Sequence, residues 1–241
     1  MIESHLHLPS AVCRFFVFNG IIYRMERVCI FIDSGNFYSL VLKKLGVQSV
    51  DFNFEKFVKY LAGERIIIKD GKRFYTGTVR NGRESKNAIS NQNTLFDNLI
   101  NAGNWSIKTS KLRTRKEKII IDERVDDYQN LLNKGIKEIF YTRQREKGID
   151  VKIATDIIVG AVDNQYDIAI LISSDTDLVP AIDWVRYGYK KKVEYVGFSL
   201  PETKNYESTR PIKSIMFKTD IQRVLVESDI RNFITNRLRR K

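Results

Sequence analysis

The stretch DIAILISSDTDLVP, residues 167–180, decides how the rest of the chain is interpreted. A continuous apolar run leads into two serines and two aspartates, and an apolar-periodic segment resumes after them. The run predicts a strand over Asp167–Ser173 that is buried on both faces, and the segment predicts a helix over Asp177–Tyr187. Asp175 and Asp177 therefore stand where a strand ends and a helix begins. Here they either cap the helix, for about 1 kcal/mol, or hold a cation.

The same succession of strand and helix recurs along most of the chain. It predicts an α/β fold with a central, mainly parallel sheet and helices on both faces. Asp70 and Gly71 predict a tight turn between two of the strands. We expect strands over residues 27–33, 64–69, 73–78, 105–112, 118–122, 136–142 and 192–198, and helices over residues 36–45, 54–61, 92–102, 125–132, 150–162 and 221–238.

The chain divides into three expected parts. Residues 1–26 form an N-terminal extension that we expect to lie outside the fold, because Met25 stands just before a clean first strand. Residues 27–200 form the main domain. Residues 201–241 form a basic C-terminal segment that we expect to be helical.

The charge and the rare residue types narrow the class of protein. The chain carries 41 Lys and Arg against 29 Asp and Glu, a net charge of +12, which favours a polyanionic partner such as RNA. The two histidines are His5 and His7, so chemistry in the body of the protein has to use other groups. Two cysteines cannot build a disulfide framework. No apolar run is long enough to span a membrane, and we expect a cytoplasmic protein.

Aspartates recur at the starts of three predicted helices. Asp33 and Asp175 follow apolar strands of a parallel sheet, so both are expected at the same rim. Asp150 starts a helix and is expected to project toward the core-facing side. Carboxylates that converge in this way repel one another unless a cation is present, and oxygen ligands suit Mg²⁺ or Mn²⁺. A cluster of acidic metal ligands within a strongly basic protein is typical of a metal-dependent nuclease.

Three segments carry a family resemblance. VCIFIDSGNFY (residues 28–38), the stretch KGIDVKIATD to KKVEYVGF (residues 147–198) and, more loosely, RFYTG (residues 73–77) resemble the NYN-domain family, a LabA-like branch of the PIN-like ribonucleases. The resemblance spans about residues 27–198, with a divergent insert near residues 113–145. It implies a PIN-like three-layer α/β/α fold with an acidic metal site at one end of the sheet.

The resemblance also implies roles for particular residues. Asp33, Asp150 and Asp175 match the main metal-binding aspartates of the family. Asn36, in the D-x-x-N pattern, would orient a water or a phosphate, and Asp177 would be an outer ligand. These five residues are the expected catalytic set.

Three further residues are secondary candidates. Ser173 and Ser174 could donate hydrogen bonds to the carboxylates or to a phosphate, or could simply cap the strand end. Asp156 matches a family acid as a metal ligand. However, six residues on from Asp150 it lies about 240° around the helix, which disfavours it.

Two basic runs precede the helix that starts at Asp150. KTSKLRTRKEK (residues 108–118) and TRQREK (residues 142–147) could bind a phosphate backbone, or they could be ordinary solvated surface. The candidate nucleic-acid-binding residues in them are Lys108, Lys111, Arg113, Arg115, Lys116, Arg143, Arg145 and Lys147.

Three functions compete on these residues. The first is a ribonuclease that hydrolyses RNA phosphodiester bonds with Mg²⁺ or Mn²⁺. The second is a non-catalytic RNA-binding or regulatory module that keeps the same fold. A phosphatase of the haloacid dehalogenase type is disfavoured because it needs a second Asp two residues after the first, and position 35 is Gly. Homo-oligomerisation is compatible with all of them.

Overall fold

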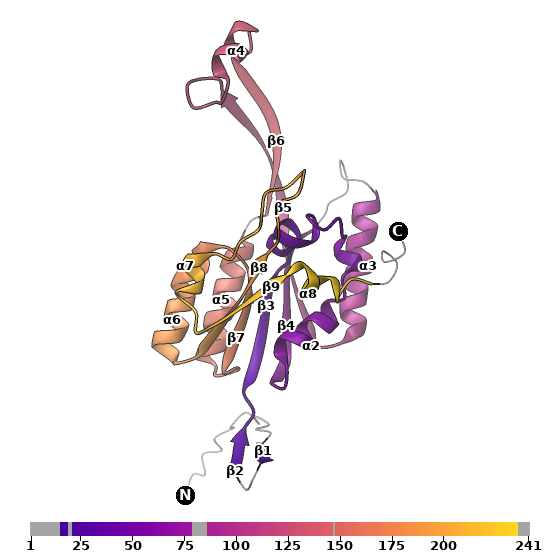
Figure 1. Ribbon diagram of the computed structural model, residues 1–241, viewed down its shortest axis with the longest axis vertical. Coiled ribbons are helices and arrows are strands. Elements are labelled where there is room, and N and C mark those ends of the chain that lie inside the picture. Colours follow the sequence, from indigo (N-terminus) through magenta and orange to yellow (C-terminus); the bar gives the residue numbers. More distant parts are fainter. Residues whose placement is uncertain (1–14, 19–20, 79–85, 147, 236–241) are drawn as a thin grey trace, which may run out of the picture.

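A seven-stranded sheet forms the centre of the protein (Figure 1). The computed structural model describes residues 15–18, 21–78, 86–146 and 148–235. The strands of the sheet are β3 (Arg27–Asp33), β4 (Ile66–Thr78), β5 (Trp105–Ile120), β6 (Glu138–Glu146), β7 (Ile168–Ile172), β8 (Lys192–Ser199) and β9 (Ile221–Val226). Outside this sheet, β1 (Phe15–Phe18) and β2 (Ile21–Arg24) form a separate antiparallel hairpin.

The strand order is β6-β5-β4-β3-β7-β8-β9. All neighbours are parallel except β5 and β6, so six parallel strands make up the core sheet. The central strand β3 pairs with β4 on one side and with β7 on the other. Asp33 therefore ends its strand beside the end of β7, as predicted from the sequence.

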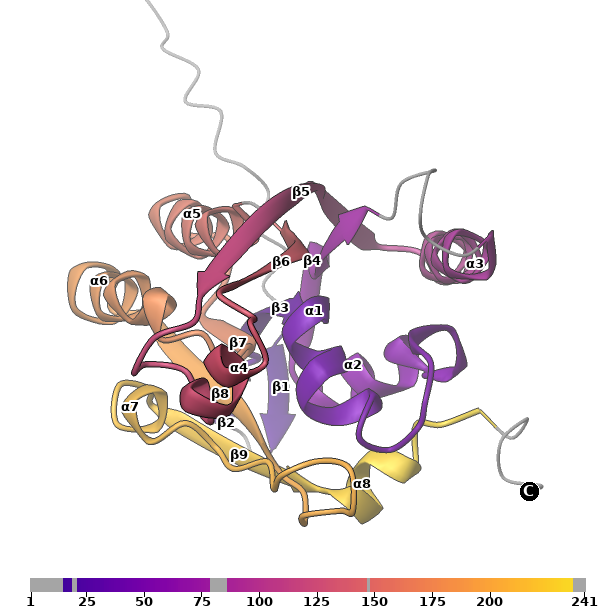
Figure 2. The ribbon, with the colours of Figure 1, turned by 90° about the horizontal axis from the view of Figure 1, so that it is seen from above.

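Helices cover both faces of the sheet (Figure 2). The helical elements of the protein are α1 (Ser34–Phe37), the π-helical turn Tyr38–Leu42, α2 (Phe54–Ala62), α3 (Lys86–Ala102), α4 (Tyr128–Asn133), α5 (Ile149–Val162), α6 (Val179–Tyr189), α7 (Lys213–Met216) and α8 (Glu227–Arg231). On one face lie α1, α2 and α3, and on the other lie α5 and α6. The predicted three-layer α/β/α, PIN-like fold is confirmed. No helix within the described parts of the chain is both long and apolar enough to cross a membrane.

Alternation along β3 explains why both faces are covered. Every residue of β3 is buried. Ile30 and Ile32 belong to the core under α1, α2 and α3, whereas Cys29 and Phe31 belong to the core under α5 and α6. Successive side chains of a strand point to opposite faces, so a continuous apolar run requires a helix layer on each side.

Two sequence expectations about β4 are corrected. Residues 64–69 and 73–78 are not separate strands joined by a reversing turn, because both halves pair parallel with β3. Val28 pairs with Ile67 and Ile30 with Lys72, so the residues between them bulge out of the ladder. Asp70 adopts a positive φ of 54° in this bulge. A left-handed residue bends the strand locally without reversing the chain.

The expected C-terminal helix over residues 221–238 is also wrong. Ile221–Val226 form β9, which pairs parallel with β8 and ends the sheet, and within residues 221–235, the part described, only Glu227–Arg231 form a helix. The segment after residue 200 therefore contributes a strand to the main sheet. The basic residues at 236–241 lie outside the described residues.

The divergent insert forms an arm, residues 112–146, that projects away from the sheet (Figure 1). β5 pairs with β4 as far as Lys111, and from Leu112 onward it pairs antiparallel with β6 instead. Of the expected strands at 118–122 and 136–142, residues 118–120 belong to β5 and residues 138–142 to β6, and α4 lies at the tip of the arm. The arm and the β1–β2 hairpin extend from opposite ends of the sheet.

An ion pair at the start of β3 makes folding stability depend on pH. Asp167 accepts hydrogen bonds from the Arg27 backbone N–H at 2.9 Å and from its Nε at 3.1 Å. Burial opposes ionisation of Asp167, but these bonds and the Arg27 charge outweigh it, so the pKa of Asp167 is lowered. A lowered pKa in the folded state stabilises the protein above the unfolded pKa, and this stabilisation is lost as the pH falls through the folded pKa.

We therefore expect Asp167→Asn to lower the free energy of unfolding by about 1 to 2 kcal/mol near neutral pH. The difference from wild type should shrink as the pH falls below about 4, because wild-type Asp167, whose pKa is lowered, then also loses its charge. Urea unfolding at several pH values measures the difference in the free energy of unfolding between the two proteins. The exposed Asp97, changed to Asn, is the control. A difference that does not change with pH would contradict this account.

Candidate carboxylate site at the rim of the sheet

The carboxyl ends of β3 and β7 place Asp33 and the serines of SSDTD side by side. Asp33 is only 6% exposed, and its Oδ1 accepts a hydrogen bond from the Asn36 N–H at 3.0 Å, which caps α1. Ser173 Oγ donates to Asp33 Oδ2 at 3.3 Å across the two strands. The carboxylate is therefore held in one orientation by a helix start and by the neighbouring strand.

Asn36 joins the same two segments. Its Oδ1 accepts hydrogen bonds from Ser174 N–H at 3.1 Å and from Ser174 Oγ at 3.0 Å. Ser173 Oγ in turn accepts from the Asp175 N–H at 3.2 Å. The two serines thus fix the loop after β7 to the start of α1: Ser173 donates to an aspartate, as predicted, whereas Ser174 donates to Asn36.

Asp175 serves as a cap and also lines a cavity. Its Oδ1 accepts a hydrogen bond from the Asp177 N–H at 2.9 Å and starts the short helical turn Thr176–Leu178. Asp177 itself is exposed. The two aspartates of the stretch are therefore not equivalent.

Asp150 reaches this rim from the first turn of α5. Burial, the adjacent carboxylate of Asp175 and the charge of Asp177 all raise the pKa of Asp150. A cavity of about 390 Å³, here called the carboxylate cavity, opens between these elements. Its lining consists of Asp33, Gly35, Asn36, Ser39, Leu40, Ile149, Asp150 and Asp175. The structure thus brings the three principal predicted aspartates to one cavity.

The carboxylates do not form a complete metal cage by themselves. Within the described residues, no group of three or more His, Cys, Asp or Glu side chains is arranged to hold a metal ion. Mg²⁺ commonly binds through only one or two carboxylates and takes its other ligands from water and substrate phosphates. The Asp150–Asp175 pair, with Asp33 in the same cavity, fits that mode of binding.

Asp156 lies in a different environment. Its Oδ2 accepts a hydrogen bond from Tyr75 OH at 2.6 Å and pairs with Lys108 Nζ at 2.6 Å. It lines a separate pocket with Arg73 and Gln165 rather than the carboxylate cavity. The structure therefore does not bring Asp156 to the other aspartates, and the Lys108 ammonium is already paired.

The remaining candidate nucleic-acid-binding residues lie mainly on the arm. Lys116 is exposed, and the positions of Arg113, Arg115, Arg143 and Arg145 lie on the two strands of the arm. Lys111 is the last residue of β5 that pairs with β4. Lys147 lies outside the described residues.

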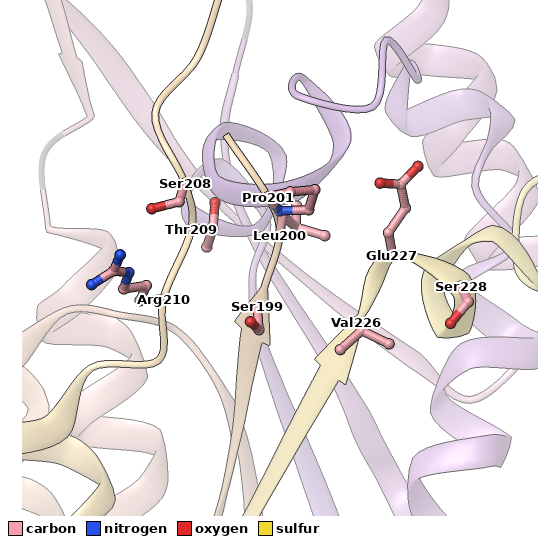
Figure 3. A pocket seen from close by; sticks show the side chains of 9 residues that line it. All are labelled: Ser199, Leu200, Pro201, Ser208, Thr209, Arg210, Val226, Glu227 and Ser228. Carbon is pink, nitrogen blue, oxygen red and sulfur yellow. The ribbon is translucent and has the colours of Figure 1, made fainter. Parts of the chain in front are cut away.

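A second pocket on the same rim was not predicted from the sequence (Figure 3). It has a volume of about 490 Å³ and lies where β8 and β9 end. Arg210 and Glu227 lie on opposite sides of it. Its lining is Ser199, Leu200, Pro201, Ser208, Thr209, Arg210, Val226, Glu227 and Ser228. Its position depends on β9, which the sequence pattern had indicated as helix.

The fold and the position of the acids define an α/β/α protein of the PIN-like class. The chain matches the NYN domain over residues 27–214 and belongs to that family. Comparison with curated proteins finds no significant match. Among solved structures, the chain is similar to the crystal structure of VPA0982, a protein of unknown function from Vibrio parahaemolyticus RIMD 2210633. The TM-score is 0.52 and the identity 18%, covering 86% of this chain and 96% of that chain, so the likeness concerns the fold.

Proposed function

We propose that the protein is a ribonuclease that hydrolyses RNA phosphodiester bonds at the carboxylate cavity with Mg²⁺ or Mn²⁺. The observation that carries this proposal is the convergence of Asp33, Asp150 and Asp175, from three separate elements, on one cavity. Membership of the NYN family supports a nucleic-acid substrate. The net charge of +12 supports a polyanionic one.

The donor set suits a hard cation. Asp150 and Asp175 lie against each other, and their mutual repulsion would be relieved by a divalent ion between the strand end and the helix start. Asp33, which lines the same cavity, would complete the set. When bound, such an ion would stabilise charge on the phosphate and favour ionisation of an attacking water.

Polar residues in and next to the cavity would position the carboxylates and the substrate. Ser173 and Asn36 hold the Asp33 carboxylate and the start of α1 in place. Because Asn36 Oδ1 is occupied by Ser174, its amide group is left to face a water or a phosphate oxygen. Exposed Asp177 would act from outside, through water.

The test is RNA cleavage by the full purified chain with Mg²⁺ or Mn²⁺. We expect EDTA to abolish cleavage and Asp150→Asn to reduce it by about 100-fold or more, because the variant removes one carboxylate of the pair. Asp163→Asn, at the other end of α5, is the matched control and should keep wild-type activity. Cleavage that survives both EDTA and Asp150→Asn would refute the proposal. Binding of RNA without any cleavage would instead favour the non-catalytic module.

A further inference from the structure

The pocket at the ends of β8 and β9, here called the β8–β9 pocket, has a lining of mixed polarity (Figure 3). Its volume of about 490 Å³ falls within the range of ligand sites, roughly 300 to 1,000 Å³. Leu200, Pro201 and Val226 supply apolar surface, and the charged residues Arg210 and Glu227 lie on opposite sides. A nucleotide has the same mixture of properties, because it combines an apolar base face, polar base edges and an anionic phosphate.

Several polar groups of the β8–β9 pocket are available to a ligand. Within the described parts of the chain, the side chains of Arg210, Ser199 and Ser208 form no hydrogen bond or ion pair. Glu227 Oε1 accepts a hydrogen bond from Arg231 Nε at 2.7 Å, which anchors the carboxylate and leaves Oε2 available. A ligand could therefore meet a cation, a carboxylate oxygen and two hydroxyl groups without first breaking a contact within the protein.

One hydrogen bond connects the walls of the β8–β9 pocket and the carboxylate cavity. Thr209, which lines the pocket, donates from its Oγ1 to the carbonyl oxygen of Leu40 at 2.8 Å, and Leu40 lines the carboxylate cavity. Thr209 also exchanges two backbone hydrogen bonds of 3.0 Å with Leu200. Lys44 Nζ donates to the Glu207 carbonyl oxygen at 2.7 Å. The loop after β8 is therefore fixed to the segment after α1, and the two cavities are neighbours.

The register of the sheet places both cavities at the same rim. Phe31 pairs with Leu171, and Leu171 pairs with Tyr195. Asp33 is therefore level with Gly197, near the end of β8. Since β8 is two strands away from β3, the ends of these strands are roughly 10 Å apart across the sheet. One RNA strand could enter both cavities.

We propose that the β8–β9 pocket binds one nucleotide of the substrate RNA, close to the phosphate that is cleaved in the carboxylate cavity. Leu200 and Val226 would contact the face of the base, and Glu227 would accept hydrogen bonds from N–H groups on the base edge or from ribose hydroxyls. Arg210 would bind a phosphate oxygen. The inference rests on the proposed function for its ligand, RNA. It adds that this RNA is single-stranded at the pocket, because a paired and stacked base cannot enter it.

The experiment compares two double variants of the full chain that each remove one cation and one anion. The pocket variant, Arg210→Ala/Glu227→Ala, removes both charges from the lining. The control variant, Glu202→Ala/Lys204→Ala, removes the same charges from two exposed positions of the loop after β8 that do not line the pocket. Both variants keep the net charge of +12, so the general attraction to RNA is unchanged. Circular dichroism should show both to be folded, because the lost ion pair with Arg231 lies at the surface.

Fluorescence anisotropy in EDTA measures the binding of a single-stranded hexaribonucleotide and of a duplex that contains the same sequence. We expect the pocket variant to bind the single strand about tenfold more weakly, since it loses hydrogen bonds to charged groups. The control variant should stay within about twofold of wild type, because exposed charges contribute little. Duplex binding should be the same in all three proteins. Unchanged single-strand binding by the pocket variant would overturn the inference, as would an equal loss in both variants or an equal loss on the duplex.

The binding measurement separates this inference from the proposed function, because binding in EDTA does not require cleavage. If RNA is never cleaved but the pocket variant alone loses affinity for the single strand, the ribonuclease proposal fails and the nucleotide pocket stands. If RNA is cleaved and the pocket variant binds the single strand like wild type, only the nucleotide pocket fails.

Discussion

Asp175→Asn is expected to reduce kcat for RNA cleavage by at least about 100-fold, whereas Asp177→Asn should reduce it by less than about tenfold. Asp175 lines the carboxylate cavity and lies against Asp150. Asp177 is exposed and is not part of that lining. The two variants each remove one negative charge from the same short loop, so they differ chiefly in access to the cavity.

Replacement of Asp by Asn is expected to preserve the fold, so that a change in kcat reports on the lost carboxylate. The Asn side-chain oxygen can still accept the hydrogen bond that the Asp177 N–H makes to Asp175 Oδ1 at 2.9 Å, so the cap of the short turn is retained. Thermal unfolding should therefore change little. Steady-state cleavage of one fluorescent RNA under identical metal concentrations measures both variants. Comparable losses of kcat in the two variants would mean that activity depends on the overall charge of the loop and not on a carboxylate in the cavity.

Arg65→Ala should have the largest effect on stability, about 3 to 5 kcal/mol, because it leaves a buried carboxylate without its main partner. Glu194 on β8 is completely buried, and Arg65 Nη1 donates to its Oε2 at 2.6 Å. Arg223 Nη2 on β9 lies 2.8 Å from the other oxygen. Since domains are stable by only about 5 to 15 kcal/mol, a loss of this size would unfold a large share of the protein on mild heating.

Urea unfolding measures the loss in the free energy of unfolding. A variant that breaks an exposed ion pair serves as the control. Arg231→Ala breaks an ion pair with Glu227 on the surface of α8 and should cost less than about 1 kcal/mol. Adding Glu194→Gln to Arg65→Ala should recover part of the stability, because the buried charge is then gone. If the double variant is no more stable than Arg65→Ala, the cost does not come from an unpaired charge.

The sequence predicted the centre of the fold well because both central strands are buried on both faces. β3 and β7 are short apolar runs, and such runs bounded by polar residues are typical of strands buried on both faces. The polar residues that follow them had to meet at one rim. The convergence of Asp33 and Asp175 therefore followed from the topology, and Asp150 joined them from the start of a helix. The helical wheel also correctly disfavoured Asp156, which faces Tyr75 and Lys108.

The features that the sequence could not show depend on pairing between distant segments. The edge strand β9 has polar residues among its apolar ones and leads directly into a helical turn, so its pattern resembled one longer helix. The pairing of residues 112–120 with 138–146 depends on where the chain reverses at the tip of the arm. Neither basic run alone indicates that position 113 pairs with position 145 in the ladder of the two strands.

The place of β9 in the sheet has a consequence for the order in which the protein can fold during synthesis. β9 is the last strand of the sheet to be made, yet it covers the edge of β8, whose interior is entirely buried in the finished protein. Until β9 arrives, that edge offers unpaired backbone groups on an apolar strand, and Glu194 lacks Arg223. During synthesis the exposed edge of β8 can therefore pair with strands of other chains, until β9 is made and covers that edge.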